Sequence, residues 1–244
     1  MTTVSMVVAT YNRTPLLWNS LTALADKTWP DELIVVDDGG DDGCEGICGD
    51  LRASTGMPIR YAYNHRPYDS MAAQARNAGL KMTDCDWILS AEPECQFESD
   101  VVAQFHAYRD VYPNELLNAG TVHHEHPDWN PPQITETVNW QALWVCFYAR
   151  DWVLSVGGYD EGFPSGWSWD DVDLGTRLFA AGHGQRNLTD VHVLHQWHPH
   201  RGMDQSKNEA HFRAKMKPGA NGEDQCMEVV ANQGREWGVL IPRP

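Results

Sequence analysis

The sequence has no long apolar run and few basic residues. No stretch reaches the roughly 18 apolar residues that a membrane helix needs, and the segment after Met1 lacks the basic and apolar regions of a secretory signal. Lysine and arginine total 18 against 34 acidic residues, which gives a formal net charge of −16. This charge opposes binding to a polyanion, so a large nucleic-acid footprint is disfavoured. We expect a cytoplasmic protein without a membrane span.

Cysteine is also scarce, and repeats and low-complexity linkers are missing. The six cysteines show no zinc-ribbon spacing. Cys44 and Cys48 form the one close pair, and without a second pair or a nearby histidine they are interpreted as reduced thiols. With 244 residues, 42% of them hydrophobic, the chain can bury a substantial core. We predict one α/β domain with a short tail.

Short apolar strands alternate with helical segments in the first half, which is typical of a mostly parallel sheet flanked by helices. Strands are predicted at residues 4–8, 33–36, 59–63, 87–89, 144–148 and 191–194. One helix is predicted with Thr14 as its N-cap and Pro15 at the first helical position, and a second with Ser70 as its cap, ending at residue 82. Further helices are predicted over 99–111 and 168–181. Residues 123–132 are predicted to form a loop. In such sheets, ligands bind beyond the carboxyl ends of the strands.

Hydrogen-bonding side chains follow the first two predicted strands. Residues 9–13 read ATYNR and residues 37–40 read DDGG. These side chains suit the base and ribose of a nucleotide, although aspartate and glycine also favour turns for backbone reasons alone. On the next predicted helix, Arg76 can place its guanidinium against a diphosphate. The alternative for Arg76 is an ordinary surface arginine.

Two glutamates follow the strand at 87–89. Glu92 and Glu94 are one residue apart, so in an extended chain both point to the same side. Both can then approach one hard cation and its bound diphosphate. Exposed glutamate pairs are common, and this pair gains weight only from its position after a buried strand. We predict a divalent metal here, Mn²⁺ or Mg²⁺.

Acidic and aromatic residues precede the helix predicted at 168–181. Residues 166–174 read GWSWDDVDL. Asp170 and Asp171 are favoured in a first helical turn by the helix dipole, and Ser168 with Asp171 approximates a capping box. Capping does not explain the flanking residues, which suit an aromatic platform for a sugar. These candidate acceptor-binding residues are Gly166, Trp167 and Trp169.

A histidine cluster, HQWHPH, follows the strand predicted at 191–194. A neutral imidazole can add a nitrogen ligand to a metal already held by carboxylate. His195 is the first choice for this role and His198 the second. A surface cluster is the alternative interpretation, and it is preferred for His200.

Taken in order, these segments resemble glycosyltransferase family 2, whose members carry a TYNR-like loop, VDDG, ARNAG and an Asp-x-Asp motif. The resemblance covers about residues 4–200 and implies a GT-A fold. Glutamates stand at both aspartate positions of the metal motif. The resemblance implies that Thr10, Asn12, Asp38 and Arg76 bind the nucleotide. The motif residues beside them, Tyr11, Arg13 and Asp37, are further candidates.

Residues 157–174 resemble the GGFDE and GWGxEDxDL region of galactosyl- and N-acetylgalactosaminyltransferases. That resemblance implies that Asp171 is the general base, that Asp170 hydrogen-bonds the acceptor, and that a histidine completes the metal site. We expect residues 1–200 to form the GT-A domain, with 1–97 as the nucleotide-sugar half and 98–200 as the acceptor half. The tail 201–244 is expected to pack on or near the active site.

The expected reaction is an inverting sugar transfer from a nucleotide-sugar to an acceptor hydroxyl. A UDP-sugar is the expected donor because Asp38 suits a uracil, and GDP- and dTDP-sugars stay open. The acceptor is a saccharide, a protein, a lipid-linked glycan or a modified nucleic acid base. The alternatives are a non-catalytic nucleotide- or sugar-binding protein and a nucleotidyltransferase, which residues 9–13 disfavour because they lack a glycine-rich loop.

Overall fold

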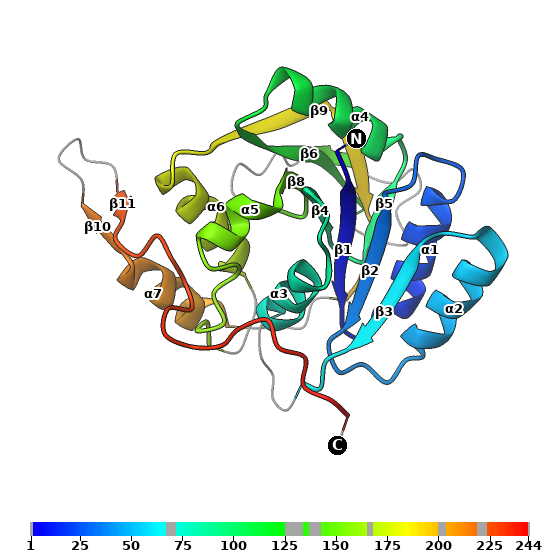
Figure 1. Cartoon of the computed structure of the whole chain (residues 1–244), viewed down its shortest axis with the longest axis horizontal. Coiled ribbons are helices and arrows are strands. Elements are labelled where there is room, and N and C mark those ends of the chain that lie inside the picture. Colours follow the sequence, from blue (N-terminus) through cyan, green and yellow to red (C-terminus); the bar gives the residue numbers. More distant parts are fainter. Residues whose placement is uncertain are drawn as a thin grey trace.

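The computed structural model describes residues 2–66, 72–124, 134–136, 143–164, 168–199, 204–218 and 224–243. In these residues a central sheet is covered by helices on both faces (Figure 1). The strand order is β3-β2-β1-β4-β8-β6-β9-β5, with β7 paired to β6. No helix in this part of the chain is long and apolar enough to span a bilayer.

The first half of the sheet is parallel, because helices connect successive strands. The strands are β1 (Val4–Thr10), β2 (Glu32–Asp37), β3 (Ile59–Tyr63) and β4 (Trp87–Ala91). The helices between them are α1 (Thr14–Leu24), α2 (Cys44–Thr55) and α3 (Ala73–Met82). Every side chain of β1 is buried, as expected for a strand covered on both faces. The four strands predicted for this half are confirmed.

The second half extends the sheet in mixed directions. Its strands are β5 (Cys95–Phe97), β6 (Glu115–His124), β7 (Ile134–Glu136), β8 (Val145–Ala149) and β9 (Gly184–His195). Its helices are α4 (Val101–Val111), α5 (Arg150–Ser155) and α6 (Asp170–Ala180). Strand β8 is antiparallel to β4, whereas β6 and β9 are parallel to each other. The loop prediction at 123–132 is wrong at its start, because residues 123–124 belong to β6.

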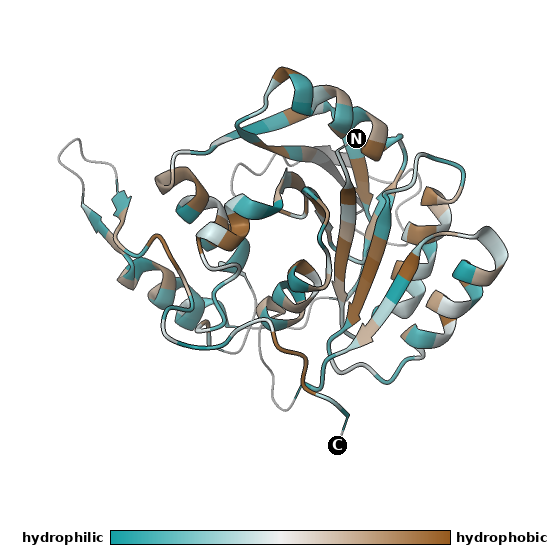
Figure 2. Ribbon diagram, in the orientation of Figure 1, coloured by the Kyte–Doolittle hydropathy of each residue, from teal (hydrophilic) through white to brown (hydrophobic). Residues whose placement is uncertain are grey.

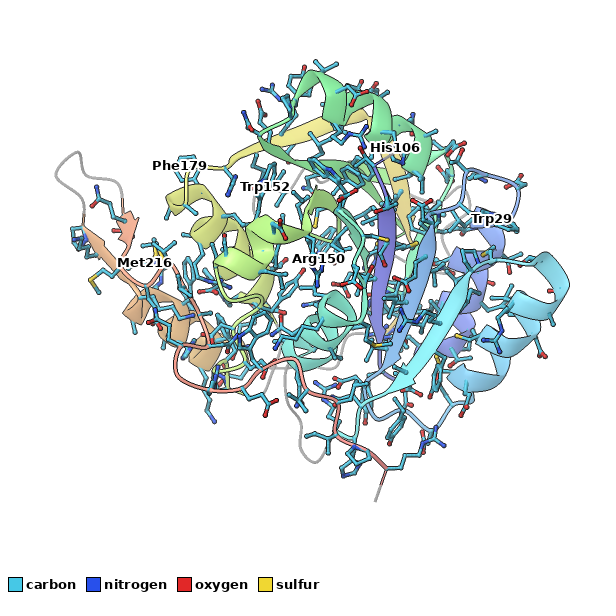
Figure 3. The ribbon with its side chains drawn as sticks, in the orientation of Figure 1. Trp29, His106, Arg150, Trp152, Phe179 and Met216 are labelled. Carbon is cyan, nitrogen blue, oxygen red and sulfur yellow. The ribbon has the colours of Figure 1, made fainter. Side chains whose placement is uncertain are left out.

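Two apolar cores hold the helices to the sheet, and Figure 2 shows the apolar residues concentrated on its strands. On one face, leucines of α1 pack with Phe105 of α4 and Phe147 of β8, whose rings stack at 5.3 Å. On the other face, Leu80 of α3 and Leu174 of α6 pack together. Full burial of each such side chain contributes about 1.5–3 kcal/mol. Outside these cores, Phe179 is 73% exposed and points away from α6 (Figure 3).

Two helix starts differ from prediction. Helix α1 begins at Thr14 itself, and Arg13 precedes it without a capping side chain. The Thr14 N–H is satisfied instead by Asp42 Oδ2 at 2.7 Å. Helix α3 begins at Ala73, and its predicted cap, Ser70, lies outside the described residues.

The chain beyond residue 204 packs against the second half and α3 (Figure 1). It contains α7 (Ser206–Ala214), β10 (Met216–Pro218) and β11 (Asp224–Cys226). Asn232 Nδ2 then donates to the carbonyls of Gly157 and Tyr159 at 2.8 and 2.7 Å. Gly157 has φ +78°, and a Cβ there would lie 2.2 Å from the Ala231 carbonyl oxygen. The tail therefore fits closely against the glycine turn at 157–158.

Candidate active site at the carboxyl ends of the strands

The polar segments after β1 and β2 lie side by side. Thr10 and Asp37 are partners in the parallel ladder, and the Asp38 N–H donates to the Thr10 carbonyl at 2.7 Å. Thr10 and Asp38 are 3% and 1% exposed. Within the described residues, Thr10 Oγ1 and Asp38 Oδ2 accept or donate no hydrogen bond. Buried polar atoms are normally hydrogen-bonded, so these two atoms are candidates to contact a ligand.

Asp37 and Asn12, also predicted to bind the nucleotide, hold the loops together. Asp37 Oδ1 accepts from the Gly40 N–H at 2.7 Å, and Oδ2 accepts from the Tyr61 hydroxyl at 2.9 Å. Asn12 Oδ1 accepts from the Asp41 N–H at 2.9 Å. The structure thus uses both carboxylate oxygens of Asp37 to fix the turn after β2.

Arg66 is a member of this group that the sequence did not reveal. Its Nε lies 3.5 Å from Asp38 Oδ2, and its guanidinium lies over the Tyr11 ring at 4.9 Å. Burial raises the pKa of Asp38, and the charge of Arg66 opposes that rise. Gly39 makes the approach possible, because a Cβ there would meet Arg66 Cβ at 2.7 Å. The only signal in the sequence is a basic residue three positions after a predicted strand.

Arg76 of α3 bridges two acidic residues from different elements. Its guanidinium pairs with Glu92, after β4, and with Asp170, at the start of α6. It also lies over the Tyr159 ring at 5.2 Å. Burial disfavours its charge, but Glu92 and Asp170 hold the pKa of Arg76 above its ordinary value. Arg76 is therefore a partly buried link between the two halves and not an ordinary surface arginine.

The chain between Glu92 and Glu94 is a turn, so the expectation of an extended chain there is wrong. The Cys95 N–H donates to the Glu92 carbonyl at 3.0 Å, which closes a turn over 92–95 and breaks the alternation of an extended chain. Glu92 pairs with Arg76 instead of joining Glu94. Burial raises the pKa of Glu92 to about 7, Arg76 opposes the rise, and the Glu94 charge adds to it.

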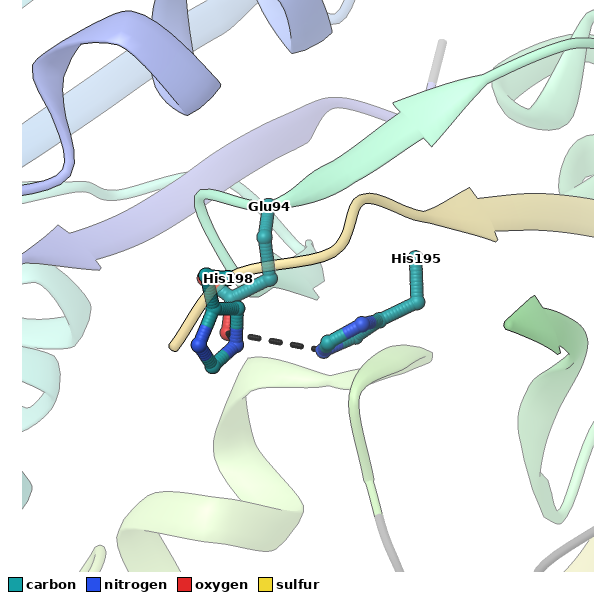
Figure 4. A group of neighbouring side chains, drawn as sticks. All are labelled: Glu94, His195 and His198. Atoms are coloured by element: carbon teal, nitrogen blue, oxygen red, sulfur yellow. Dashed lines mark ion pairs between the residues drawn. The ribbon is translucent and has the colours of Figure 1, made fainter. Parts of the chain in front are cut away.

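Glu94, His195 and His198 come together beyond β4 and β9 (Figure 4). Glu94 Oε1 lies 3.5 Å from His195 Nε2 and 3.3 Å from His198 Nε2. The antiparallel pairing of β5 with β9 aligns Cys95 with His195 and so brings these distant segments together. Burial favours protonated Glu94, but hydrogen bonds from both histidines outweigh it and hold the pKa of Glu94 well below its ordinary value.

The donor atoms of this cluster fit a divalent cation. One carboxylate oxygen and two imidazole nitrogens lie within 4.8 Å of one another. Imidazole nitrogens favour first-row transition-metal ions over Mg²⁺, which prefers oxygen ligands. Of the four predicted ligands, the structure groups Glu94, His195 and His198 and leaves Glu92 with Arg76.

The acidic residues of α6 differ in their surroundings. Asp170 pairs with Arg76. Asp171 accepts from the Val172 N–H at 2.8 Å and from the Leu143 N–H at 3.2 Å. Burial, followed by the charge of Asp170, raises the pKa of Asp171 to about 6. Asp171 is thus a carboxylate that ionises close to neutral pH.

The capping-box alternative for this helix is wrong. Helix α6 begins at Asp170, and the residue before it, Trp169, provides no capping side chain. Ser168 and Trp169 have φ +75° and +80°, in the left-handed region that non-glycine residues rarely adopt. Such strain clusters at functional sites. Trp169 packs on Phe212 at 5.1 Å between ring centroids, and Gly166 and Trp167 lie outside the described residues.

The family profile of glycosyl transferase family 2 matches residues 5–150. The chain belongs to glycosyltransferase family 2. The matched segment includes the ends of β1, β2 and β4, together with Arg76, Glu92 and Glu94. The expectation of a glycosyltransferase is thereby confirmed at the level of the family.

The curated relatives are much longer proteins than this chain. The hyaluronan synthase of Pasteurella multocida is 24% identical over 80% of this chain and 24% of its own length. The chondroitin synthase of Pasteurella multocida strain Pm70 is also 24% identical, over 80% of this chain and 25% of its own length. The chain therefore spans about a quarter of the length of the curated relatives it matches.

Solved structures share the fold at low sequence identity. Staphylococcus aureus TarS 1–349 in complex with UDP-GlcNAc is 16% identical, with a TM-score of 0.66 over 82% of this chain and 60% of that one. The mannosyltransferase PcManGT from Pyrobaculum calidifontis, in complex with GDP-Man and Mn²⁺, is 17% identical. Its TM-score is 0.62 over 87% of this chain and 61% of that one. The predicted GT-A fold is confirmed.

Proposed function

We propose that this chain is an inverting glycosyltransferase that moves a sugar from a UDP-sugar to an acceptor hydroxyl. The observation that carries the proposal is the Glu94, His195 and His198 cluster, which lies at the strand ends with a second set of acids. The charges of Glu94, Asp170 and Asp171 all act on Glu92, so metal-side and acceptor-side carboxylates belong to one site. A module that only binds nucleotides has no need of the second set.

On the donor side, Asp38 Oδ2 accepts from the ring N–H of the base, and Thr10 Oγ1 binds the nucleoside. Their burial without a hydrogen-bond partner in the described residues supports this assignment. Arg66 and Tyr11 form the neighbouring wall. The TarS complex with UDP-GlcNAc supports a uridine donor, and the mannosyltransferase complex with GDP-Man makes a guanosine donor the alternative.

Glu94, His195 and His198 would hold the divalent cation, and the Mn²⁺ in the mannosyltransferase structure supports Mn²⁺. When bound, such a cation neutralises charge on the leaving diphosphate. Arg13, at the start of α1, acts electrostatically on Glu94 and so lies on the diphosphate side. Arg76 is occupied by two carboxylates, so we assign it to holding Asp170 in place and not to binding the diphosphate.

Asp171 removes the proton from the acceptor hydroxyl as that oxygen bonds to the anomeric carbon and the bond to the diphosphate breaks. Attack from the face opposite the nucleotide inverts the configuration. The pKa of about 6 supports the role, because a general base works best when its pKa lies near the operating pH. The resemblance of residues 157–174 to galactosyl- and N-acetylgalactosaminyltransferases points to the same residue.

A saccharide is the acceptor that we favour. The curated relatives are named as synthases of hyaluronan and chondroitin, which supports a glycan acceptor. The net charge of −16 argues against a nucleic acid, because both would be negative. Gly166, Trp167 and Trp169 remain the proposed acceptor platform, with residues 201–244 beside it.

Calorimetric titration of UDP, GDP and dTDP, with Mn²⁺, Mg²⁺ or EDTA, tests the donor site. We expect UDP to bind with Mn²⁺ and to lose about ten-fold or more in affinity with EDTA or in Glu94→Ala, because a cation bridges the protein and the diphosphate. Glu98→Ala, at an exposed position, is the matched control and should bind normally. Failure of every nucleotide to bind under every condition would overturn the proposal.

A further inference from the structure

The C-terminal segment 237–243 crosses the carboxyl end of β3, next to the donor site (Figure 1). The Gly238 N–H donates to Glu161 Oε1 at 2.7 Å, and Gln74 Nε2 donates to the Val239 carbonyl at 3.0 Å. The His65 N–H donates to the Ile241 carbonyl at 2.6 Å. The segment is therefore fastened to the turn at 157–161, to α3 and to the chain just after β3.

Asn64 connects this segment to Asp38. Its side chain is 1% exposed, its Oδ1 accepts from the Ile241 N–H at 2.9 Å, and its Nδ2 donates to Asp38 Oδ1 at 2.8 Å. A main-chain N–H can only donate, so it selects the oxygen of the Asn64 amide as its partner. The amino group must then face Asp38. The Ile241 N–H, which lies outside the nucleotide-binding half, thereby sets the orientation of the buried Asn64 amide.

The consequence falls on the two oxygens of Asp38. Oδ1 accepts from Asn64, while Oδ2, near Arg66, accepts no hydrogen bond within the described residues. Because the hydrogen bond from Asn64 holds Oδ1, the Asp38 carboxylate cannot rotate freely, and the position of Oδ2 is fixed. A base with a ring N–H, such as uracil, can donate to this oxygen, whereas cytosine presents an acceptor at the same ring position.

We propose that Ile241, through its main chain, and Asn64 are positioning residues that set how Asp38 reads the donor base. This inference rests on the proposed function, in which Asp38 accepts from the base. The segment 237–243 lies beyond residue 150, where the family match ends, so the relay is a feature of this chain's own C-terminal region. The substrate class it selects is a uridine nucleotide over a cytidine nucleotide.

Three variants separate the relay from general packing. Asn64→Asp keeps the side-chain shape but turns a carboxylate oxygen toward Asp38. Ile241→Pro removes the main-chain donor, and Ile241→Ala keeps it while losing the side chain. The measurements are calorimetric affinities for UDP and CDP with Mn²⁺, together with kcat and KM for the UDP-sugar.

We expect Asn64→Asp and Ile241→Pro to weaken UDP binding by about ten-fold, the usual effect of losing one buried hydrogen bond. CDP should be affected less, so the preference for UDP over CDP narrows. The KM for the donor should rise while kcat stays within about two-fold, because Asp171 and its surroundings are untouched. Ile241→Ala should bind UDP as the wild type does.

Asp38→Ala distinguishes the two possible failures. Unchanged UDP binding in Asp38→Ala would refute the assignment of the base site and the relay with it. Weakened binding in Asp38→Ala beside normal binding in Asn64→Asp would refute the relay alone. An equal loss for UDP and CDP in both relay variants would also refute it, because the effect would then be loosened packing. If Ile241→Pro lowers the melting temperature, the UDP and CDP affinities of Asn64→Asp alone decide the outcome.

Discussion

Asp171 lies beside the charge of Asp170 and accepts from two main-chain N–H groups, and its ionisation gives the site a definite pH dependence. Burial and Asp170 raise its pKa to about 6, against the opposing charge of Arg76. The folded-state pKa therefore exceeds the unfolded value, so this group favours folding below the unfolded pKa, and that contribution is lost as pH rises through about 6. At pH 5 Asp171 is mostly protonated and no longer acts as a base, but its protonation does not lower the free energy of unfolding.

We expect kcat/KM to fall about ten-fold per pH unit below about pH 6, because only ionised Asp171 accepts the acceptor's proton. Asp171→Asn should lose about 10²–10⁴-fold in kcat and bind UDP normally. Asp151→Asn, at an exposed position, is the control and should be fully active. In Glu92→Gln we expect the same fall of kcat/KM at acidic pH. This result would show that Glu92, whose pKa is raised to about 7, is not the group that titrates. Substantial activity in Asp171→Asn would show that another group is the base.

At the scale of elements, buried ion pairs of Asp173 with Arg177 and Lys215 hold α6 in place. Asp173 accepts from Arg177 Nε at 2.7 Å and from Lys215 Nζ at 2.8 Å. Lys215 also pairs with Asp160, in the turn that precedes α6. Arg177 donates to the Val156 carbonyl at 2.6 Å. The tail thus fixes the helix whose first turn carries Asp170 and Asp171.

Replacing Lys215 tests this anchoring. Lys215→Met leaves Asp160 and Asp173 buried without their shared cation, so we expect the free energy of unfolding to fall by about 3–5 kcal/mol in urea titrations at pH 7. Lys217→Met, at an exposed position, should change it by less than about 0.5 kcal/mol. A loss under about 1 kcal/mol in Lys215→Met would mean that the buried charges are held by other groups.

Acid should remove part of the same stabilisation. Burial raises the pKa of Asp160, but hydrogen bonds from Lys215 and His211 outweigh it and keep the pKa below its ordinary value. The group therefore stabilises the fold above its unfolded pKa and loses that effect as pH falls through the folded value. Lys215→Met should accordingly show a shallower loss of stability on acidification than the wild type.

The elements differ in how far the sequence predicts them. Apolar runs such as residues 4–8 predict the parallel strands, because their shortness favours a buried strand over a helix, which needs a longer segment. Strand β6 was missed because Asn118 and the histidines at its end interrupt the apolar pattern. The segment with Glu92 and Glu94 was expected to be extended and is a turn instead, because a main-chain hydrogen bond that the sequence does not reveal closes it.

The residues of the site also divide into those that the local sequence predicts and those that it does not. Asp38, which follows β2, and Arg76, on α3, belong to short motifs that can be found in the sequence. Asn64 and Lys215 are not found in this way, since their partners lie 177 and 55 positions away at Ile241 and Asp160. Contacts of this kind depend on the tertiary fold, and no local pattern predicts them.

At the scale of the whole molecule, the metal cluster joins the two halves of the chain. Glu94 belongs to residues 1–97, while His195 ends β9 and His198 follows it, about a hundred positions later. A cation bound by all three adds a link that exists only in the folded state. It also lowers the negative charge of a chain at −16, which reduces self-repulsion.

Mn²⁺ should therefore stabilise the entire fold. At a free concentration of 100 Kd the gain is about 2.7 kcal/mol, which corresponds to a rise in melting temperature of roughly 5–10 °C for a chain of this size. His195→Ala and Glu94→Gln should lose most of this shift, because each removes one ligand, whereas Glu98→Gln should keep it. Differential scanning calorimetry with Mn²⁺ and with EDTA measures the effect. An equal shift in all variants would place the cation elsewhere, since a site built from these three side chains must weaken when one is lost.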